Sequence, residues 1–284
     1  MHQTKRILIT GGHGFIGTRL TKMLRFFDHT VTTVDAVAPK LASRPNEAHI
    51  KDVSIYLQEI QTATELPNLY EATEPYDVIV HLAATMQSTS PEATLDNNMR
   101  ALTSVLGYCR THPTTRLIFA SAAGGHPTAH HLSKQLGEQL VRHYTTTFGI
   151  DAVVVRFFHV YGPGGENTEH SRVLTECKHA LMQKADASGL LGVVDDFVHV
   201  DDVVRGIVVI VCDPTPAQQY ELGSAAPVTV QMIIDAFASD DGLAVMPPCA
   251  SDDDLPSTWP VGWSPSYHVI TYLNSWVSTG YPDG

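Results

Sequence analysis

The chain has 284 residues, of which 43% are hydrophobic and 17% charged, a composition typical of a soluble globular protein with one large core. Its net charge of −12 at pH 7 argues against a nucleic-acid partner, because phosphate binding requires clustered Lys and Arg and the sequence has no such run. The apolar run Val203–Cys212 is interrupted by Arg205 and is far shorter than the roughly 20 residues that span a bilayer, so no membrane segment is expected. The N-terminal apolar stretch is too short for a signal peptide, and four widely spaced cysteines fit a reducing environment, which together predict a cytoplasmic location.

Short apolar runs alternate with longer segments of helical periodicity, which predicts an α/β fold whose parallel sheet is covered by helices on both faces. The predicted strands are Arg6–Thr10, Thr30–Asp35, Ala48–Lys51, Asp77–Leu82, Arg116–Ser121 and Ala152–Arg156. The predicted helices are Phe15–Phe26, Pro91–Thr111, Thr128–Phe148, Ser171–Lys184, Val203–Val211, Val230–Ala238 and Tyr267–Val277, with a loop over Met246–Pro265.

The first predicted strand and helix are joined by a glycine-rich turn, which runs Gly11-Gly12-His13-Gly14-Phe15-Ile16-Gly17. In such a turn Gly11 permits the tight bend, Gly14 lets the backbone approach a pyrophosphate, and Gly17 allows the helix to pack closely on the strand. The helix N-terminus presents N–H groups and a positive dipole end to the phosphates. Asp35, at the end of the second strand, is placed to accept hydrogen bonds from ribose hydroxyls. Together these features predict an NAD(P)-binding site.

The choice between NAD and NADP depends on charges near the second strand. Asp35 would repel a phosphate on the adenosine ribose, which favours NAD. His13, Lys40 and Arg44 lie beside the turn or after the second strand and leave NADP open.

Further strings downstream carry a family resemblance. They are Asp52-Val53, His81-Leu82-Ala83-Ala84, Asn98, the run from Arg156 to Gly164 (RFFHVYGPG) and the run from Asp196 to Asp202 (DFVHVDD). With the glycine-rich turn, and up to about Gly223, the sequence resembles the extended short-chain dehydrogenase/reductase family, the group of nucleotide-sugar epimerases and dehydratases. The resemblance implies cofactor contacts by Gly11, Gly14, Phe15, Ile16, Gly17, Asp35, Asp52, Val53, Leu82, Ala83, Ala84, Asn98 and Lys134.

The resemblance also implies a domain organisation. We expect a doubly wound parallel-sheet Rossmann fold with a small C-terminal substrate-binding lobe. Residues 1–165 would form the NAD(P)-binding domain and residues 166–284 mainly the lobe, with 196–223 returning to the Rossmann domain. Many relatives pair through helices of the sheet domain, so a homodimer is a further expectation.

The catalytic positions depart from the family pattern. The family uses Tyr-x-x-x-Lys on a helix, where the i, i+4 spacing brings both side chains to one face. Here Lys134 is retained, but His130 stands where the tyrosine is expected. Ser121 matches the first serine of the family's stretch after the fifth strand, whereas Ala122 and Ala123 follow it. The predicted catalytic residues are therefore Lys134, Ser121 and His130, without the usual phenol.

Two substrate positions differ as well. Family members that bind nucleotide diphosphate sugars have an Arg before the Asp-Phe-Val string, and this chain has Asp195 there. His159 replaces the family's Asn in the Arg-Phe-Phe-Asn string. A carboxylate would repel a diphosphate, so a conventional sugar nucleotide is disfavoured as the substrate.

Three explanations for the missing phenol stay open. His130 supplies the proton, since an imidazolium titrates near neutral pH; or the substrate supplies its own proton; or the protein binds cofactor without catalysis. The pattern resembles atypical extended reductases that lack the tyrosine and modify aromatic polyketides such as angucyclinones. It favours an NAD(P)H-dependent ketoreductase for a bulky aromatic or polyketide substrate in antibiotic biosynthesis, with substrate-assisted protonation. The alternatives are a nucleotide-sugar epimerase or dehydratase with a rebuilt site, and a non-catalytic NAD(P)-binding regulator.

Histidine is abundant, with 15 residues that include the neighbours His130 and His131. Adjacent helical residues point about 100° apart, which prevents them from chelating one ion well. No HExxH spacing occurs either, so no metal site is predicted.

Overall fold

The computed structural model describes residues 3–36, 54–57, 74–86, 90–124, 128–165, 174, 194–229, 231–233, 256–269 and 271–272. The chain divides into two compact units. The first unit comprises Met1–Ala122, His126–Arg156 and Ile210–Tyr220, and the second comprises Ala123–Gly125, Phe157–Val209 and Glu221–Gly284. The expected domains, residues 1–165 and 166–284 with 196–223 returning to the first, stay a prediction beside these units, which divide after Arg156 and return at Ile210–Tyr220. The substrate-binding role of the C-terminal part stays a prediction.

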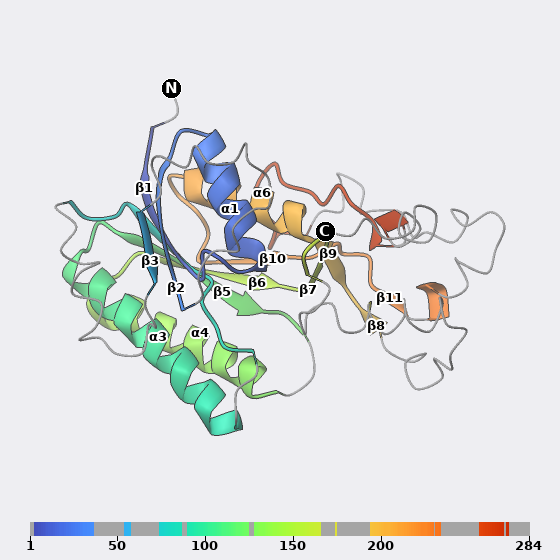
Figure 1. Cartoon of the computed structure of the whole chain (residues 1–284), viewed down its shortest axis with the longest axis horizontal. Coiled ribbons are helices and arrows are strands. Elements are labelled where there is room, and N and C mark those ends of the chain that lie inside the picture. Colours follow the sequence, from blue (N-terminus) through green and yellow to red (C-terminus); the bar gives the residue numbers. More distant parts are fainter. Residues whose placement is uncertain are drawn as a thin grey trace. The chain divides into compact units, whose positions relative to one another are not determined.

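The central sheet follows the strand order β10-β6-β5-β4-β1-β2-β3 over the described residues (Figure 1). Its strands are β1 (Arg6–Thr10), β2 (Thr30–Asp35), β3 (Ser54–Leu57), β4 (Val78–His81), β5 (Arg116–Ala122), β6 (Ala152–Phe157) and β10 (Gln219–Leu222). β1 pairs in parallel with β2 and with β4, and β4 pairs in parallel with β5. The register sets Thr10 opposite His81 and His81 opposite Phe119, so the carboxyl ends of these strands share one edge. In such sheets this edge is where ligands bind.

Helices cover both faces of the sheet in the first unit. α3 (Pro91–Thr111) and α4 (Ala129–Phe148) lie side by side on one face, and α1 (Phe15–Phe26) lies on the other (Figure 1). Because both faces are covered, the central strands carry mainly apolar side chains, and every residue of β4 is buried. The predicted doubly wound α/β fold with a parallel sheet is confirmed.

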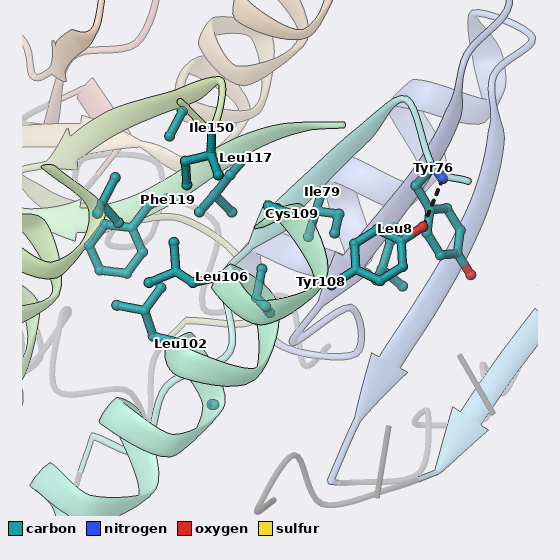
Figure 2. Packing of buried hydrophobic residues seen from close by; sticks show 14 of the residues in the cluster. Leu8, Tyr76, Ile79, Leu102, Leu106, Tyr108, Cys109, Leu117, Phe119 and Ile150 are labelled. Carbon is teal, nitrogen blue, oxygen red and sulfur yellow. Dashed lines mark hydrogen bonds between the residues drawn. The ribbon is translucent and has the colours of Figure 1, made fainter. Parts of the chain in front are cut away.

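The main core of the first unit lies between the sheet and the face of α3 and α4 (Figure 2). Leu102 and Leu106 of α3 project toward Leu117 and Phe119 of β5, all at most 2% exposed. At the end of this core, the hydroxyl of Tyr108 accepts a hydrogen bond of 3.2 Å from the backbone N–H of Tyr76. The apolar side chains that recur at helical spacing on α3 thus provide the packing that the periodicity predicts.

The second unit contains short strands and its own apolar cluster. Its elements are β7 (His159–Tyr161), β8 (Val194–Asp195), β9 (Phe197–His199) and β11 (Val228–Thr229), and α6 (Val200–Cys212) begins in it. β7 pairs in parallel with β9, and β8 pairs antiparallel with β11. The fully buried carboxylate of Asp202 accepts hydrogen bonds from the backbone N–H groups of Ser266 and Tyr267, and ion-pairs with Arg205. The indole of Trp263 donates to the Asp202 carbonyl, so Trp263 anchors the C-terminal segment.

The predicted elements agree with the observed ones except at the third strand. β1, β2, α1 and α3 have the predicted bounds, and α4 begins one residue later because Thr128 is its N-cap. The strand predicted at 48–51 lies outside the described residues, and the observed third strand is Ser54–Leu57. Asp52 and Val53 come just before this strand in the sequence and also lie outside the described residues, so their cofactor contacts stay a prediction. Of the helices expected at 171–184, 230–238 and 267–277, only short pieces lie within the described residues.

Candidate active site

The glycine-rich turn between β1 and α1 is tightly closed. Gly11 has a positive φ of 73°, and a Cβ there would lie 2.7 Å from the backbone nitrogen of Ala83. A Cβ on Gly17 would overlap the carbonyl oxygen of Gly11. Gly14, by contrast, is exposed, and a Cβ there would meet only the Gly11 oxygen, at 3.3 Å. The turn is therefore compact on its inner side and open at Gly14, the form that a pyrophosphate-binding turn needs.

The N-terminus of α1 is free of competing side chains. Gly14 is its N-cap and makes no side-chain cap, and no acidic residue lies in the first turn, which begins with Phe15 and Ile16. The first N–H groups of a helix have no partner within the helix, and together with the helix dipole they attract anions. This end of α1 is therefore suited to bind phosphate.

Asp35 is held against the same turn at the end of β2. One of its carboxylate oxygens accepts a hydrogen bond of 2.9 Å from the backbone N–H of His13. The His13 ring lies 3.2 Å from the hydroxyl of Thr33. The structure thus fixes a negative charge beside the turn, as an acceptor of ribose hydroxyls requires. Lys40 and Arg44 lie outside the described residues.

The segment after β4 packs against the end of β1. The Leu82 N–H donates to the Thr10 carbonyl at 3.0 Å, and the Ala83 N–H donates to the Thr10 hydroxyl at 3.4 Å. The same hydroxyl lies 2.7 Å from Nδ1 of His81. Burial, together with the nearby Lys134 ammonium, lowers the pKa of His81 to about 3. His81 is therefore neutral at physiological pH and serves to hold the two strand ends together.

Lys134 is buried on α4, with only 7% of its surface exposed. Its ammonium donates a hydrogen bond of 2.8 Å to the carbonyl of Ala120 on β5 and lies over the Phe119 ring, 5.3 Å from the centroid. Burial lowers the pKa of Lys134 to about 8. A buried cation is costly unless a ligand or partner compensates its charge, and among the described residues burial is the only influence on the Lys134 pKa, with no carboxylate acting on it.

His130, Ser133 and Asn98 meet in a polar cluster with Thr85. Asn98 of α3 donates to the Thr85 carbonyl at 3.0 Å and accepts from the Thr85 N–H at 2.6 Å. It also donates to the Ser133 hydroxyl at 2.9 Å, which in turn donates to the His130 carbonyl at 2.6 Å. Nδ1 of His130 lies 3.3 Å from the Thr85 carbonyl. Two helices and the loop after β4 are thereby joined by side-chain hydrogen bonds.

Ser121 takes part in a different network. Its hydroxyl donates to Glu138 at 2.5 Å, and Arg156 binds both oxygens of that carboxylate, at 2.8 and 2.6 Å. Burial alone would raise the pKa of Glu138, but the hydrogen bonds from Arg156 and Ser121 lower it. The catalytic assignment of Ser121 stays a prediction, and the observed contacts give it a structural role. Glu138 was not predicted, although its position one turn after Lys134 is a signal for it.

The two predicted substrate residues of the second unit contact each other. Nε2 of His159 lies 3.1 Å from a carboxylate oxygen of Asp195, and both side chains are mostly buried. The His159 ring packs near Phe197, with 5.6 Å between ring centroids. Their role in substrate binding stays a prediction, as does the cofactor contact of Ala84. Asp52 and Val53 lie outside the described residues.

The residues of the first unit fit a nicotinamide dinucleotide. The start of α1 has no side-chain cap and Gly14 is exposed, Asp35 provides an acceptor, and Lys134 is a buried cation without a described counterion. Among the described residues, no three His, Cys, Asp or Glu side chains gather closely enough to hold a metal ion. Within the same part of the chain, no helix has the length and apolar character needed to cross a membrane.

Comparisons with known proteins agree with this geometry. The family model "NAD dependent epimerase/dehydratase family" matches residues 7–223. YtcB, an uncharacterized UDP-glucose epimerase of Bacillus subtilis strain 168, is 27% identical over 267 residues, which cover 84% of this chain and 82% of YtcB. The UDP-glucose 4-epimerase of Thermotoga maritima, solved with UDP-glucose, is 21% identical with a TM-score of 0.70, over 94% of this chain and 96% of that one. The UDP-glucose 4-epimerase of Thermus thermophilus, solved with NAD, is also 21% identical, with a TM-score of 0.71 and the same coverage of both chains.

The chain belongs to the NAD dependent epimerase/dehydratase family. The predicted resemblance to extended short-chain dehydrogenases/reductases is confirmed at this level. The prediction of a ketoreductase for aromatic polyketides in antibiotic biosynthesis is wrong, because the relatives are epimerases of sugar nucleotides. That prediction rested on residues that the chain lacks at positions 130 and 195. A missing residue indicates what a site has lost, but not which substrate it accepts.

Proposed function

We propose that the protein is an NAD-dependent epimerase or dehydratase that acts on a nucleotide-bound sugar through a rebuilt proton-transfer site. The observation that carries this proposal is the arrangement on α4. Lys134 and His130 are one turn apart on that helix, and both are buried. The hydrogen bond from Lys134 to Ala120 places its ammonium near the carboxyl end of β5. The glycine-rich turn follows the carboxyl end of β1 in the same sheet.

Each part of this arrangement has a chemical task. The α1 N-terminus would hold the pyrophosphate, Asp35 the adenosine ribose and Lys134 the ribose next to the nicotinamide. An oxidised nicotinamide dinucleotide, when bound, accepts a hydride from a carbinol carbon and later returns it. Since the hydride returns within one turnover, such an enzyme needs no second reductant. The fixed carboxylate of Asp35 favours NAD over NADP, because it would repel a ribose phosphate.

The class of substrate follows from the relatives. YtcB and both structural neighbours are epimerases of UDP-glucose, which supports a sugar nucleotide over other alcohols. The His159–Asp195 contact supports a substrate that differs from UDP-glucose, because a carboxylate gives a diphosphate no favourable charge there.

The proposal is tested by incubating the purified protein with NAD and a panel of UDP- and GDP-sugars. Proton NMR follows the sugar, and nicotinamide absorbance follows the cofactor. We expect conversion of at least one sugar nucleotide without net accumulation of reduced cofactor. Binding of NAD with no conversion across the panel, or stoichiometric accumulation of reduced cofactor, would contradict the proposal. An inverted hydroxyl identifies an epimerase, and loss of water identifies a dehydratase.

A further inference from the structure

The imidazole of His130 is oriented by the carbonyl oxygen of Thr85. The distance from Nδ1 to this oxygen is 3.3 Å. A carbonyl oxygen only accepts hydrogen bonds, so Nδ1 must carry the hydrogen in this contact. A neutral imidazole has a single N–H, and its other nitrogen is then the base. The contact therefore makes Nε2 the nitrogen that gains and loses a proton.

The Thr85 carbonyl is itself held in place. Asn98 forms two hydrogen bonds with the backbone of Thr85, at 2.6 and 3.0 Å, through its carbonyl and its amide nitrogen. The second hydrogen of that amide nitrogen goes to the Ser133 hydroxyl, which donates to the carbonyl of His130. The four residues thus form a closed ring of hydrogen bonds. Asn98, His130 and Ser133 are each at most 8% exposed, so water competes little for these bonds.

We propose that His130 carries the substrate proton on Nε2, and that Asn98 and Thr85 are positioning residues that keep the imidazole in this form. This inference rests on the proposed function. During oxidation of an alcohol, Nε2 would accept the hydroxyl proton, while oxidised nicotinamide dinucleotide, when bound, would accept the hydride from carbon. The products are a ketone and an imidazolium. During reduction of the ketone, the proton returns from Nε2 to oxygen as the hydride returns to carbon.

A neutral carbonyl partner suits this cycle better than a carboxylate would. The Nδ1–H bond to Thr85 persists in both protonation states, so the ring does not have to turn or change tautomer. A carboxylate would instead favour the imidazolium and slow release of its proton. Lys134, which follows one turn later on the same helix face, donates to the Ala120 carbonyl.

The tautomer can be measured without turnover. Nitrogen-15 NMR of histidine-labelled, cofactor-free protein distinguishes a protonated Nδ1 from a protonated Nε2, and the His130→Phe variant identifies the signal of His130. We expect protonated Nδ1 in the wild type near neutral pH and a mixture of tautomers in Asn98→Ala. Ser104→Ala is the matched control. It removes a hydrogen bond within α3 and leaves the hydrogen bonds among Thr85, Asn98, His130 and Ser133 in place. A wild-type signal with protonated Nε2 and bare Nδ1 would overturn the proposal.

Kinetics supply the second readout. In His130→Phe we expect kcat to fall by more than ~100-fold, the size of a general acid–base contribution, with NAD affinity unchanged. In Asn98→Asp the Thr85 carbonyl loses a donor and a carboxylate is added near the ring. The acid limb of the kcat profile should therefore move to higher pH, with KM changed less than kcat. Unchanged kcat in His130→Phe, or an unmoved acid limb in Asn98→Asp, would overturn the proposal. Failure of the proposed function would appear instead as an inactive wild type that nevertheless has the expected tautomer.

Discussion

Helices α1 and α4 both contribute residues to the candidate active site, but they begin in different ways. α1 starts at an exposed glycine, with no side-chain cap and no acid in its first turn. α4 starts at Thr128, whose hydroxyl accepts a hydrogen bond of 3.1 Å from the His131 N–H. The first helix has no side-chain partner for its terminal N–H groups, whereas in the second the Thr128 hydroxyl satisfies the His131 N–H. The difference fits the proposed roles, in which α1 binds phosphate through its backbone and α4 acts through the side chains on its buried face.

The largest effect is expected from a single methyl group in α1. In Gly17→Ala the new Cβ overlaps the Gly11 carbonyl, so the turn must open and NAD affinity should fall by more than ~100-fold. Gly107→Ala in α3 is the same chemical change in open space and should stabilise the protein by about 0.5–1 kcal/mol. Calorimetric titration with NAD and urea denaturation measure both variants. Equal NAD affinity in the two variants would disprove the role of the turn.

Removal of the buried Lys134 charge on α4 should change the stability of the protein and its NAD affinity in opposite directions. The pKa of Lys134 is lowered from 10.5 to about 8, so at lower pH the folded protein bears the cost of a buried ammonium. Lys134→Met should therefore raise the unfolding free energy of the cofactor-free protein by about 1–3 kcal/mol near neutral pH, while NAD affinity falls. Denaturation with and without NAD measures both effects.

The gain from Lys134→Met has a defined pH dependence. Between about pH 8 and 10.5 the unfolded chain binds this proton more tightly than the folded one, so wild-type stability rises with pH. The advantage of the variant should accordingly disappear by the upper end of this range. A variant that is less stable than the wild type near neutral pH would show that the ammonium is already compensated without a ligand.

His81 should make the protein sensitive to acid. Its pKa is about 3 in the folded protein against 6.5 for the free group, so the unfolded state gains a proton first as the pH falls below 6.5. Between these two pH values, protonation of His81 in the unfolded state should lower the free energy of unfolding by up to about 1.4 kcal/mol per pH unit. His81→Gln keeps hydrogen-bonding capacity without titrating and should flatten the curve. Parallel curves for variant and wild type would contradict the assignment.

The smallest effects are expected from variants that remove the side-chain cap of α4 or add one to α1. Thr128→Ala removes the cap of α4 and should cost about 1 kcal/mol of stability without changing NAD affinity. Gly14→Asp places an acid at the start of α1, where it should cap the helix and repel a pyrophosphate, weakening NAD binding. If Gly14→Asp binds NAD as tightly as the wild type, the first turn of α1 is not the phosphate site.

Sequence alone predicts the α1 half of this comparison well and the α4 half poorly. The glycine spacing, the preceding strand and Asp35 all lie within a short stretch, and local sequence determines such a turn. The contacts of His130 depend on Thr85 and Asn98, which are 45 and 32 positions away and come from other elements. The same holds for Ser121, whose partner Glu138 is 17 positions away. Long-range partners of this kind follow from strand order and helix packing, which motifs do not specify.

The error about the substrate has a related cause. Asp195 and the absence of a tyrosine at position 130 are departures from a pattern, and the sequence offers no compensating motif beside them. In the structure, Asp195 contacts His159, and Nδ1 of His130 contacts the Thr85 carbonyl. These contacts support the proposal of a rebuilt proton-transfer site.

The central claim is that α4 supplies the proton while the α1 side holds the cofactor, and transient kinetics test it most directly. The NAD-loaded protein is mixed rapidly with a sugar nucleotide that it converts, and the absorbance of reduced nicotinamide is followed. We predict that this signal rises and then decays within a turnover, and that His130→Phe slows the rise by more than ~100-fold at unchanged NAD affinity. A wild type that converts the sugar without any transient reduction, or a His130→Phe variant with an equally fast rise, would contradict the account.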